Sequence, residues 1–303
     1  MPTLPDNSRL PAWFRVPYRG GEARREVRGL LRSLQLHTVC EQARCPNLCD
    51  CWSRRTATFL ILGDRCTRDC RFCAVAHGAP PPPDPAEPER IAEAVARLEL
   101  RFVVLTSVTR DDLPDAGAGH FAACLQALRA RLPDVGIEVL TPDFGGSEAA
   151  IAAVLAAAPD VFNHNLETCA RLTPQIRSGA AYRRSLDVLA TARRLAATRP
   201  QPRPVRTKSG FMLGLGETAA EVRQMLADLR AAGVELLVIG QYLPPTPAHW
   251  PLARHATPAE FEAWARVARE EFGFAGVVSH PLARSSYHAA EVRAAAAAAP
   301  SQP

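Results

Sequence analysis

Long apolar runs are missing from this 303-residue sequence. No uninterrupted hydrophobic stretch approaches the roughly 20 residues that a membrane-spanning helix requires, so we expect no integral membrane segment. The first 21 residues carry prolines and charges and contain no apolar stretch of the secretory type. We therefore expect a cytoplasmic protein that does not associate with a membrane.

Lysine is almost absent. Lys208 is the only lysine among 36 basic residues, and 31 acidic residues leave a formal net charge of +5. The arginines are scattered and no basic stripe with interleaved aromatic residues is present, so the sequence lacks the electrostatic pattern of a nucleic-acid-binding protein. An acidic protein partner fits this charge better.

Strand-like and helix-like segments alternate along most of the chain. Each helical segment has apolar residues at three- and four-residue spacing. The predicted strands are residues 57–62, 102–108, 137–140, 161–166, 204–215 and 236–242; the predicted helices are residues 87–100, 119–131, 147–157, 182–198, 218–232 and 258–272. Alternation of this kind predicts a parallel sheet, and six units are too few to close an eight-stranded barrel. An open partial barrel or a doubly wound sheet is expected, with ligands bound beyond the carboxyl ends of the strands.

Nine cysteines are distributed unevenly, and seven of them lie between Cys40 and Cys73. A chain of this length needs no disulfide framework, so metal binding is favoured. Cys66, Cys70 and Cys73 form a C-x3-C-x2-C motif directly after the first predicted strand. Three soft thiolates suit an iron–sulfur cube with one iron left open for a second ligand, whereas a structural zinc knuckle is the less favoured alternative because zinc sites usually pair two C-x2-C units.

A second triplet, C-x4-C-x5-C, is formed by Cys40, Cys45 and Cys51. Three thiolates again leave a four-iron cluster one ligand short, and Cys49 is the nearest conventional fourth ligand. By itself this triplet is compatible with an electron-relay cluster, a zinc loop or a patch of redox-active thiols.

The two triplets together resemble the lipoyl synthase family of the radical S-adenosylmethionine (SAM) superfamily. The resemblance covers residues 13–289 and rests on the segments HTVCEQARCPN, CRFCAVAHG, VVLTSVTRDDLPD, VFNHNLET, TKSGFMLGLGET, IGQYLPPT and RSSYHA. It implies an α/β fold, a partial (β/α)6 radical SAM barrel with an N-terminal cluster-bearing extension and a short C-terminal tail. The expected divisions are residues 1–55 for the extension, 56–280 for the barrel and 281–303 for the C-terminal segment with the R-S-S-Y motif and a disordered tail.

The resemblance implies two [4Fe-4S] clusters and SAM as cofactors. The cluster on Cys66, Cys70 and Cys73 would bind and cleave SAM; the auxiliary cluster on the other triplet would take Ser286 as its fourth ligand and donate its sulfur. The implied reaction inserts two sulfur atoms at C6 and C8 of a protein-bound octanoyl-lysine. Those carbons have no acidic proton and no leaving group, so acid–base or nucleophilic catalysis has nothing to act on. A serine oxygen is a hard ligand for such iron, and its bond should be the weak one.

Five further residues are candidates for SAM binding. Thr106 and Ser107 close the second predicted strand, Asn165 and Glu167 close the fourth, and Phe72 precedes the last cysteine of its triplet. The alternative for the strand-end residues is that they merely cap the following helices. His164 fits a hydrogen-bonded structural role better than that of a base.

The implied partners are an octanoylated lipoyl carrier domain, either of a 2-oxoacid dehydrogenase E2 subunit or of the glycine-cleavage H protein, and a flavodoxin- or ferredoxin-type electron donor. An acidic carrier would suit Arg15 and Arg19, and we expect a monomer. Rival functions are another two-cluster sulfur-inserting enzyme, such as a methylthiotransferase or a biotin-synthase-like protein, and a non-catalytic iron–sulfur or zinc protein.

Three residues depart from the family's pattern. Cys49 creates an alternative C-x3-C pair with Cys45, Arg55 stands where glycine is expected, and His280 lies close to Ser286 in the sequence. None of the three removes a predicted ligand.

Overall fold

The computed structural model describes residues 10–15, 21–53, 57–198, 204–286 and 289. Three positions of the sequence interpretation lie outside these ranges: Arg19, Arg55 and the tyrosine of the R-S-S-Y motif, Tyr287. The predicted tail beyond residue 289 lies outside them as well. None of the helices in the described ranges combines the length and the hydrophobicity that spanning a membrane requires.

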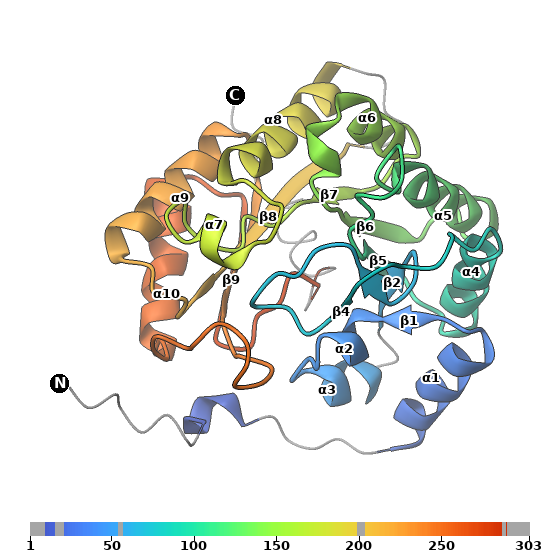
Figure 1. Ribbon diagram of the computed structural model, residues 1–303, viewed down its shortest axis with the longest axis horizontal. Coiled ribbons are helices and arrows are strands. Elements are labelled where there is room, and N and C mark those ends of the chain that lie inside the picture. Colours follow the sequence, from blue (N-terminus) through green and yellow to red (C-terminus); the bar gives the residue numbers. More distant parts are fainter. Residues whose placement is uncertain (1–9, 16–20, 54–56, 199–203, 287–288, 290–303) are drawn as a thin grey trace.

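A curved eight-stranded sheet forms the centre of the fold, and helices cover its outer face (Figure 1). Its strand order is β1-β2-β5-β6-β7-β8-β9-β10, and all neighbours are parallel except the pair β1 and β2. The strands are β1 (His37–Thr38), β2 (Thr58–Ile61), β5 (Phe102–Ser107), β6 (Gly136–Leu140), β7 (Val161–Asn163), β8 (Arg206–Leu213), β9 (Leu236–Gln241) and β10 (Gly276–Ser279). The first and last of these do not pair, so the barrel is open, and the predicted fold class is confirmed.

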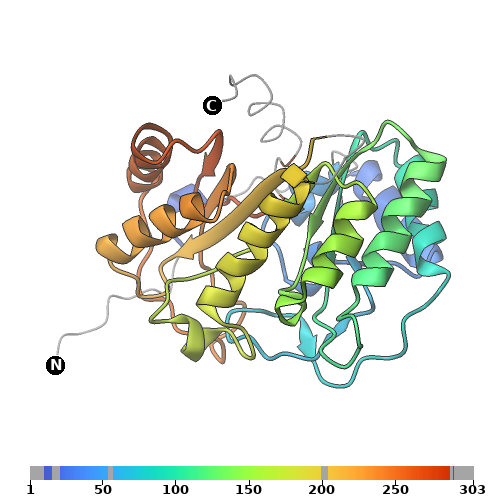
Figure 2. The same cartoon turned by 90° about the horizontal axis from the view of Figure 1, so that it is seen from above.

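The helices between the strands agree closely with the sequence prediction. They lie side by side on one face of the sheet when the molecule is seen from above (Figure 2). They are α4 (Glu87–Arg97), α5 (Ala118–Arg131), α6 (Glu148–Ala156), α8 (Tyr182–Thr198), α9 (Ala219–Ala231) and α10 (Pro258–Arg266), which continues as a π-helix (Val267–Glu271). Local signals set their ends: Thr218 and Glu221 form a reciprocal capping box at the start of α9.

Strand β10, like the two-residue strand β1, was not predicted by the sequence analysis. It is four residues long and pairs with β9, with Val277 opposite Leu237. A run this short, next to a glycine, carries little periodic signal. Its consequence for the site is large, because the chain leaves β10 directly into residues 280–286, which turn back over the open end of the barrel.

The N-terminal extension joins the barrel instead of standing apart from it. Strand β1 pairs with β2, and helices α1 (Glu22–Ser33), α2 (Val39–Gln42) and α3 (Leu48–Ser53) lie beside that edge of the sheet (Figure 1). Val27, Leu31 and Trp52 belong to the same hydrophobic core as the strands. The division into three segments at residues 55 and 280 stays a proposal.

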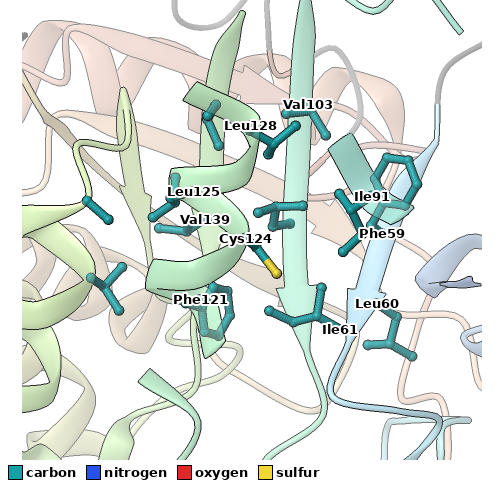
Figure 3. Close-up of a cluster of buried hydrophobic side chains, with 14 of the residues drawn as sticks. Phe59, Leu60, Ile61, Ile91, Val103, Phe121, Cys124, Leu125, Leu128 and Val139 are labelled. Carbon is teal, nitrogen blue, oxygen red and sulfur yellow. The ribbon is translucent and has the colours of Figure 1, made fainter. Parts of the chain in front are cut away.

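That core is packed between the sheet and its outer helices. Figure 3 shows Phe121, Leu125 and Leu128 of α5 facing Val103 and Val139 of the sheet. All five side chains are fully buried. Because this layer holds the outer face of the sheet, the carboxyl ends of the strands and the loops that follow them are fixed in relation to one another.

Candidate active site

One cavity of about 520 Å³ opens at the carboxyl ends of the strands. The two cysteine motifs, the strand ends and the segment after β10 all contribute to its wall. The predicted site residues on that wall are Cys40, Cys45, Cys51, Cys66, Cys70, Phe72, Cys73, Thr106, Ser107, Asn165, Glu167 and Ser286. The fold therefore gathers every predicted ligand and SAM contact around one space, although their individual roles stay predictions.

Cys66, Cys70 and Cys73 lie on the loop that follows β2. Two short parallel strands, β3 (Arg65–Cys66) and β4 (Ala76–His77), pair with each other at the start and the end of the cysteine segment. Within it, the amide of Cys73 donates to the carbonyl of Cys70 at 2.9 Å. The backbone amides of Arg68 and Thr109 donate to the Cys66 sulfur at 3.4 and 3.3 Å. Amide-to-sulfur hydrogen bonds are among the contacts that tune iron–sulfur clusters.

The loop after β9 holds this cysteine loop from the other side. The amide of Trp250 donates to the carbonyl of Arg71 at 2.8 Å, and the guanidinium of Arg71 lies 4.5 Å from the centre of the Trp250 ring. Nε2 of His249 lies 3.1 Å from the carbonyl oxygen of Cys73. Two of these contacts reach the backbone of the motif itself, so the fold supports the triplet directly.

Arg68, inside the first triplet, is fixed by two carboxylates that the sequence analysis did not connect to it. Its guanidinium pairs with Asp111 at 2.7 Å and with Asp143 at 2.8 Å. Burial opposes ionisation of Asp143, yet its hydrogen bonds with Arg68 lower its pKa to about 2. Asp111 ties the β5 loop to the cysteine loop.

The second triplet comes from helices α2 and α3 and the turn between them. The amide of Cys45 donates to the carbonyl of Cys40 at 3.1 Å, which closes that turn. Asn47, 2% exposed, donates from Nδ2 to the carbonyl of Leu282 at 2.8 Å. This bond joins residues 235 positions apart and brings the segment after β10 beside the triplet. Cys49 is absent from the cavity wall.

The two serines of the R-S-S-Y motif have different surroundings. The hydroxyl of Ser285 exchanges hydrogen bonds with the side-chain amide of Asn165, at 2.7 and 3.0 Å. Ser286 borders the cavity, and its hydroxyl makes no hydrogen bond with the described part of the chain. His280 is exposed and accepts a hydrogen bond from the amide of Leu282, away from the cavity wall. Ser286 is therefore the serine whose oxygen is available.

The thiols fit an iron–sulfur donor set. All nine cysteines are free, and burial raises the pKa of Cys40 and Cys70 to about 11 and that of Cys73 to about 12. Metal binding must then displace their protons. Among the described residues no three His, Cys, Asp or Glu side chains lie close enough to share one metal ion. A cube does not require that closeness, because its cysteines bind different iron atoms.

Two predicted SAM contacts have the properties of ligand-binding groups. Glu167 has a left-handed backbone (φ 67°), and burial raises its pKa although the guanidinium of Arg177 opposes that shift. Strained backbone is often found at functional sites. The hydroxyl of Ser107 is buried without a hydrogen-bond partner among the described residues. A polar ligand in the cavity would supply the missing partner.

The remaining candidates are partly engaged by the protein. The Thr106 hydroxyl donates to the carbonyl of Leu140 at 3.0 Å, while Asn165 binds Ser285. His164 is buried between the Thr141 carbonyl and the Ser185 hydroxyl, and desolvation lowers its pKa to about 4. A neutral imidazole with a hydrogen-bond partner at each ring nitrogen fits the structural role that the sequence analysis predicted for His164.

Comparison with known proteins gives one consistent result. Residues 60–229 match the family model of the radical SAM superfamily. Curated relatives include lipoyl synthase of Methylococcus capsulatus, 57% identical over 93% of this chain and 85% of the relative, and lipoyl synthase of Symbiobacterium thermophilum, 51% identical over 98% and 92%.

Solved structures with a similar fold include the FeFe-hydrogenase maturase HydG from Carboxydothermus hydrogenoformans, with a TM-score of 0.59 at 11% identity, covering 90% of this chain and 69% of that one. Methylornithine synthase follows, with a TM-score of 0.55 at 15% identity, covering 84% of this chain and 74% of that one. At such low sequence identity, these two structures support the fold alone.

Proposed function

This chain belongs to the lipoyl synthase family of radical SAM enzymes, and from that premise we propose how its cavity serves the family's reaction. The enzyme inserts two sulfur atoms, at C6 and C8, into an octanoyl chain carried on a protein lysine, and it uses SAM and two [4Fe-4S] clusters. The observation that carries the assignment of residues is that both cysteine triplets and Ser286 line the same cavity.

Cys66, Cys70 and Cys73 would hold the SAM-binding cluster, and Cys40, Cys45, Cys51 and Ser286 would hold the auxiliary one. When bound, the first cluster supplies the electron that splits SAM into the hydrogen-abstracting radical, and the second supplies sulfur. An unactivated carbon radical reacts with whatever it meets first, so the protein must exclude water and fix the distance between partners. The apolar wall of the cavity serves the first need: it includes Leu60, Val108 and Met212.

Charged and polar groups on the same wall would orient SAM. Glu167 and Arg177 offer a carboxylate and a guanidinium to the amino and carboxylate groups of the methionine part, and Ser107 offers a free hydroxyl. Phe72, which packs against the core near the first triplet, offers a face for the adenine ring. These groups are the protein's share of the chemistry, because they bind and position while the cofactors react.

Ser286 would complete the auxiliary site through its hydroxyl, which has no hydrogen-bond partner among the described residues. Its neighbour Ser285 is already bound to Asn165, which leaves only one serine for iron. A hard oxygen on soft iron makes a weak bond, and a weak bond suits a cluster that is consumed as a sulfur source.

The substrate is presented by a lipoyl carrier protein. For that carrier we propose the E2 subunit of a 2-oxoacid dehydrogenase or the glycine-cleavage H protein, and for the electron donor a flavodoxin or ferredoxin. Arg25 and Arg28 of helix α1 lie on one hollow of the surface, which would suit an acidic carrier domain. Nine free cysteines and oxygen-sensitive ligand chemistry fit a reducing cytoplasmic compartment.

The test separates SAM cleavage from sulfur insertion. The full chain is reconstituted with iron and sulfide without oxygen, reduced, and supplied with SAM and an octanoylated carrier; 5′-deoxyadenosine and lipoylated carrier are then measured. Cys66→Ala should abolish both products. Cys40→Ala should abolish the lipoylated carrier and halve the iron content from about eight to about four per chain, while 5′-deoxyadenosine continues to form.

Cys49→Ala is the matched control, since Cys49 belongs to the same segment as Cys40 but is not on the cavity wall. It should keep both activities and the full iron content. Lipoylated carrier from the Cys40→Ala variant, or loss of the second cluster from the Cys49→Ala variant, would show that the auxiliary ligands have been assigned wrongly.

A further inference from the structure

A buried ion pair crosses the inside of the barrel beneath the cavity. Lys208, on β8, and Glu138, on β6, are both 0% exposed. The ammonium nitrogen of Lys208 lies 2.9 and 2.8 Å from the two carboxylate oxygens of Glu138. Asn163, on the strand between them, donates to the same carboxylate at 2.8 Å.

Stability alone does not account for this pair. Removing two charges from water costs several kcal/mol for each ion, and well-packed apolar side chains often replace such a pair without loss of stability. Lys208 is also the only lysine of the chain. A cost of this kind indicates a specific use for the ammonium group.

The third hydrogen bond of Lys208 shows that use. Its ammonium nitrogen donates to the backbone carbonyl of Ser285 at 2.6 Å, so all three of its protons have acceptors. The other side of Ser285, its hydroxyl, is bound by Asn165. Gly240 permits this approach, because a Cβ there would collide with the carbonyl of Ala283. The residue before Ser286 is therefore held on two sides.

We propose that Lys208, fixed by Glu138, is a positioning residue that holds the Ser285 peptide inside the barrel and thereby places Ser286 at the wall of the second cysteine triplet. The inference rests on the proposed function only for the identity of what Ser286 binds. A weak ligand gains most from such an arrangement, because a hydroxyl that is already in place loses little conformational entropy on binding.

The first measurement needs no cluster. Amide hydrogen exchange is followed in the iron-free full chain for the peptide covering residues 281–286. Lys208→Met keeps an unbranched side chain, one atom shorter, and removes its charge. It leaves the Glu138 carboxylate buried without its cation, however, and can unfold the protein. The double variant Lys208→Met with Glu138→Gln removes both charges, and the glutamine oxygen still accepts from Asn163.

In the double variant we expect exchange at residues 281–286 to be at least tenfold faster than in the wild type, with exchange in β5 and β9 unchanged. Arg206→Met is the matched control. Arg206 lies on the same strand two residues earlier and pairs with Glu235 at 2.6 Å near the other end of the barrel. That variant should exchange like the wild type at residues 281–286.

The second measurement follows the loaded enzyme. The double variant should lose auxiliary-cluster iron at least tenfold faster than the wild type while cleaving SAM at the wild-type rate. A folded double variant with wild-type exchange at residues 281–286 overturns the proposal, and so does faster exchange with unchanged iron retention. Failure of the proposed function is seen separately, as a wild-type protein that binds only one cluster.

Discussion

The two cysteine triplets lie on one cavity but are built in opposite ways. The first, Cys66 to Cys73, is contained in a single loop of the chain that directly follows β2. The second needs partners from the two ends of the protein, because residues 40–51 meet residues 282–286 only through tertiary contacts such as that of Asn47 with Leu282. One site is local in sequence, and the other exists only in the folded protein.

This difference matches what each site has to do. The first triplet is held by backbone contacts from the β5 and β9 loops and by the paired guanidinium of Arg68, so its loop is tied to the barrel at several points. The second triplet has three cysteines on one segment and a serine on another. In the proposed assignment, the serine oxygen would be the ligand that is released most easily, while the three thiolates stay in their own segment.

Replacing Ser286 tests this contrast with the largest expected effect. Ser286→Ala removes the proposed oxygen ligand, so lipoylated carrier should fall by more than the roughly 10- to 100-fold loss typical of an outer-shell partner. Formation of 5′-deoxyadenosine should persist, because the first triplet is untouched. The measurement is a paired assay of both products together with the iron content per chain.

Ser285→Ala is the control for that experiment. It removes the hydroxyl that binds Asn165 but keeps the carbonyl that accepts from Lys208. The loss of lipoylated carrier should be less than about tenfold, the scale of one neutral hydrogen bond. If the two variants lost activity equally, the assignment of Ser286 as the ligand would fail.

Replacing Trp250 tests the other triplet. Trp250→Ala removes the ring that packs on Arg71 and the indole bond to the Leu215 carbonyl at 2.9 Å, so the first cysteine loop loses support. A displacement of about 1 Å at a reacting centre costs up to roughly 100-fold, and we expect SAM cleavage to fall between about 10- and 100-fold. Auxiliary iron content should not change.

Trp264→Ala provides the comparison for that variant. Trp264 is a partly buried tryptophan of α10 that packs against the same hydrophobic cluster, away from the cavity wall. Both variants lose a large ring, so both should be destabilised, but only the variant at Trp250 should slow 5′-deoxyadenosine formation in folded protein. Equal slowing in the two would indicate a general loss of stability.

Most of the fold was predictable because its signals are local. Six strands and their helices follow from apolar periodicity, and capping residues such as Thr218 set the helix ends. Strands β1 and β10 were missed because two and four residues carry no period. The position of β10 is decided by its pairing with β9, which only the folded chain contains.

The residues of the site likewise fall into those that local sequence signals predicted and those that only the folded chain shows. The cysteine spacing predicted both triplets, because the members of each lie within a few residues of one another. The prediction of Ser286 came from the resemblance to the family, through the R-S-S-Y motif. The pairing of Arg68 with Asp143 and of Lys208 with Glu138 spans 75 and 70 residues. A local sequence pattern cannot predict a contact between residues so far apart in the chain. Lys208 stood out in the sequence as the only lysine of the chain. Nothing in the sequence indicated that its ammonium group donates to the carbonyl of Ser285.

Asn47 offers the finest test of the idea that the second site depends on tertiary contacts. Asn47→Ala leaves the half-buried carbonyl of Leu282 without the Asn47 donor, at a cost of up to about 1.5 kcal/mol. Since 1.4 kcal/mol corresponds to a factor of ten in an equilibrium, auxiliary iron should be lost up to about tenfold faster, with SAM cleavage unchanged. Ser53→Ala is the control, because Ser53 also bonds a backbone carbonyl in this segment, that of Asp50 at 2.7 Å, without reaching residues 281–286. An Asn47 variant that kept its auxiliary iron like the Ser53 variant would mean that the α2–α3 segment holds its cluster without the C-terminal segment, and the contrast between a local and a tertiary site would be lost.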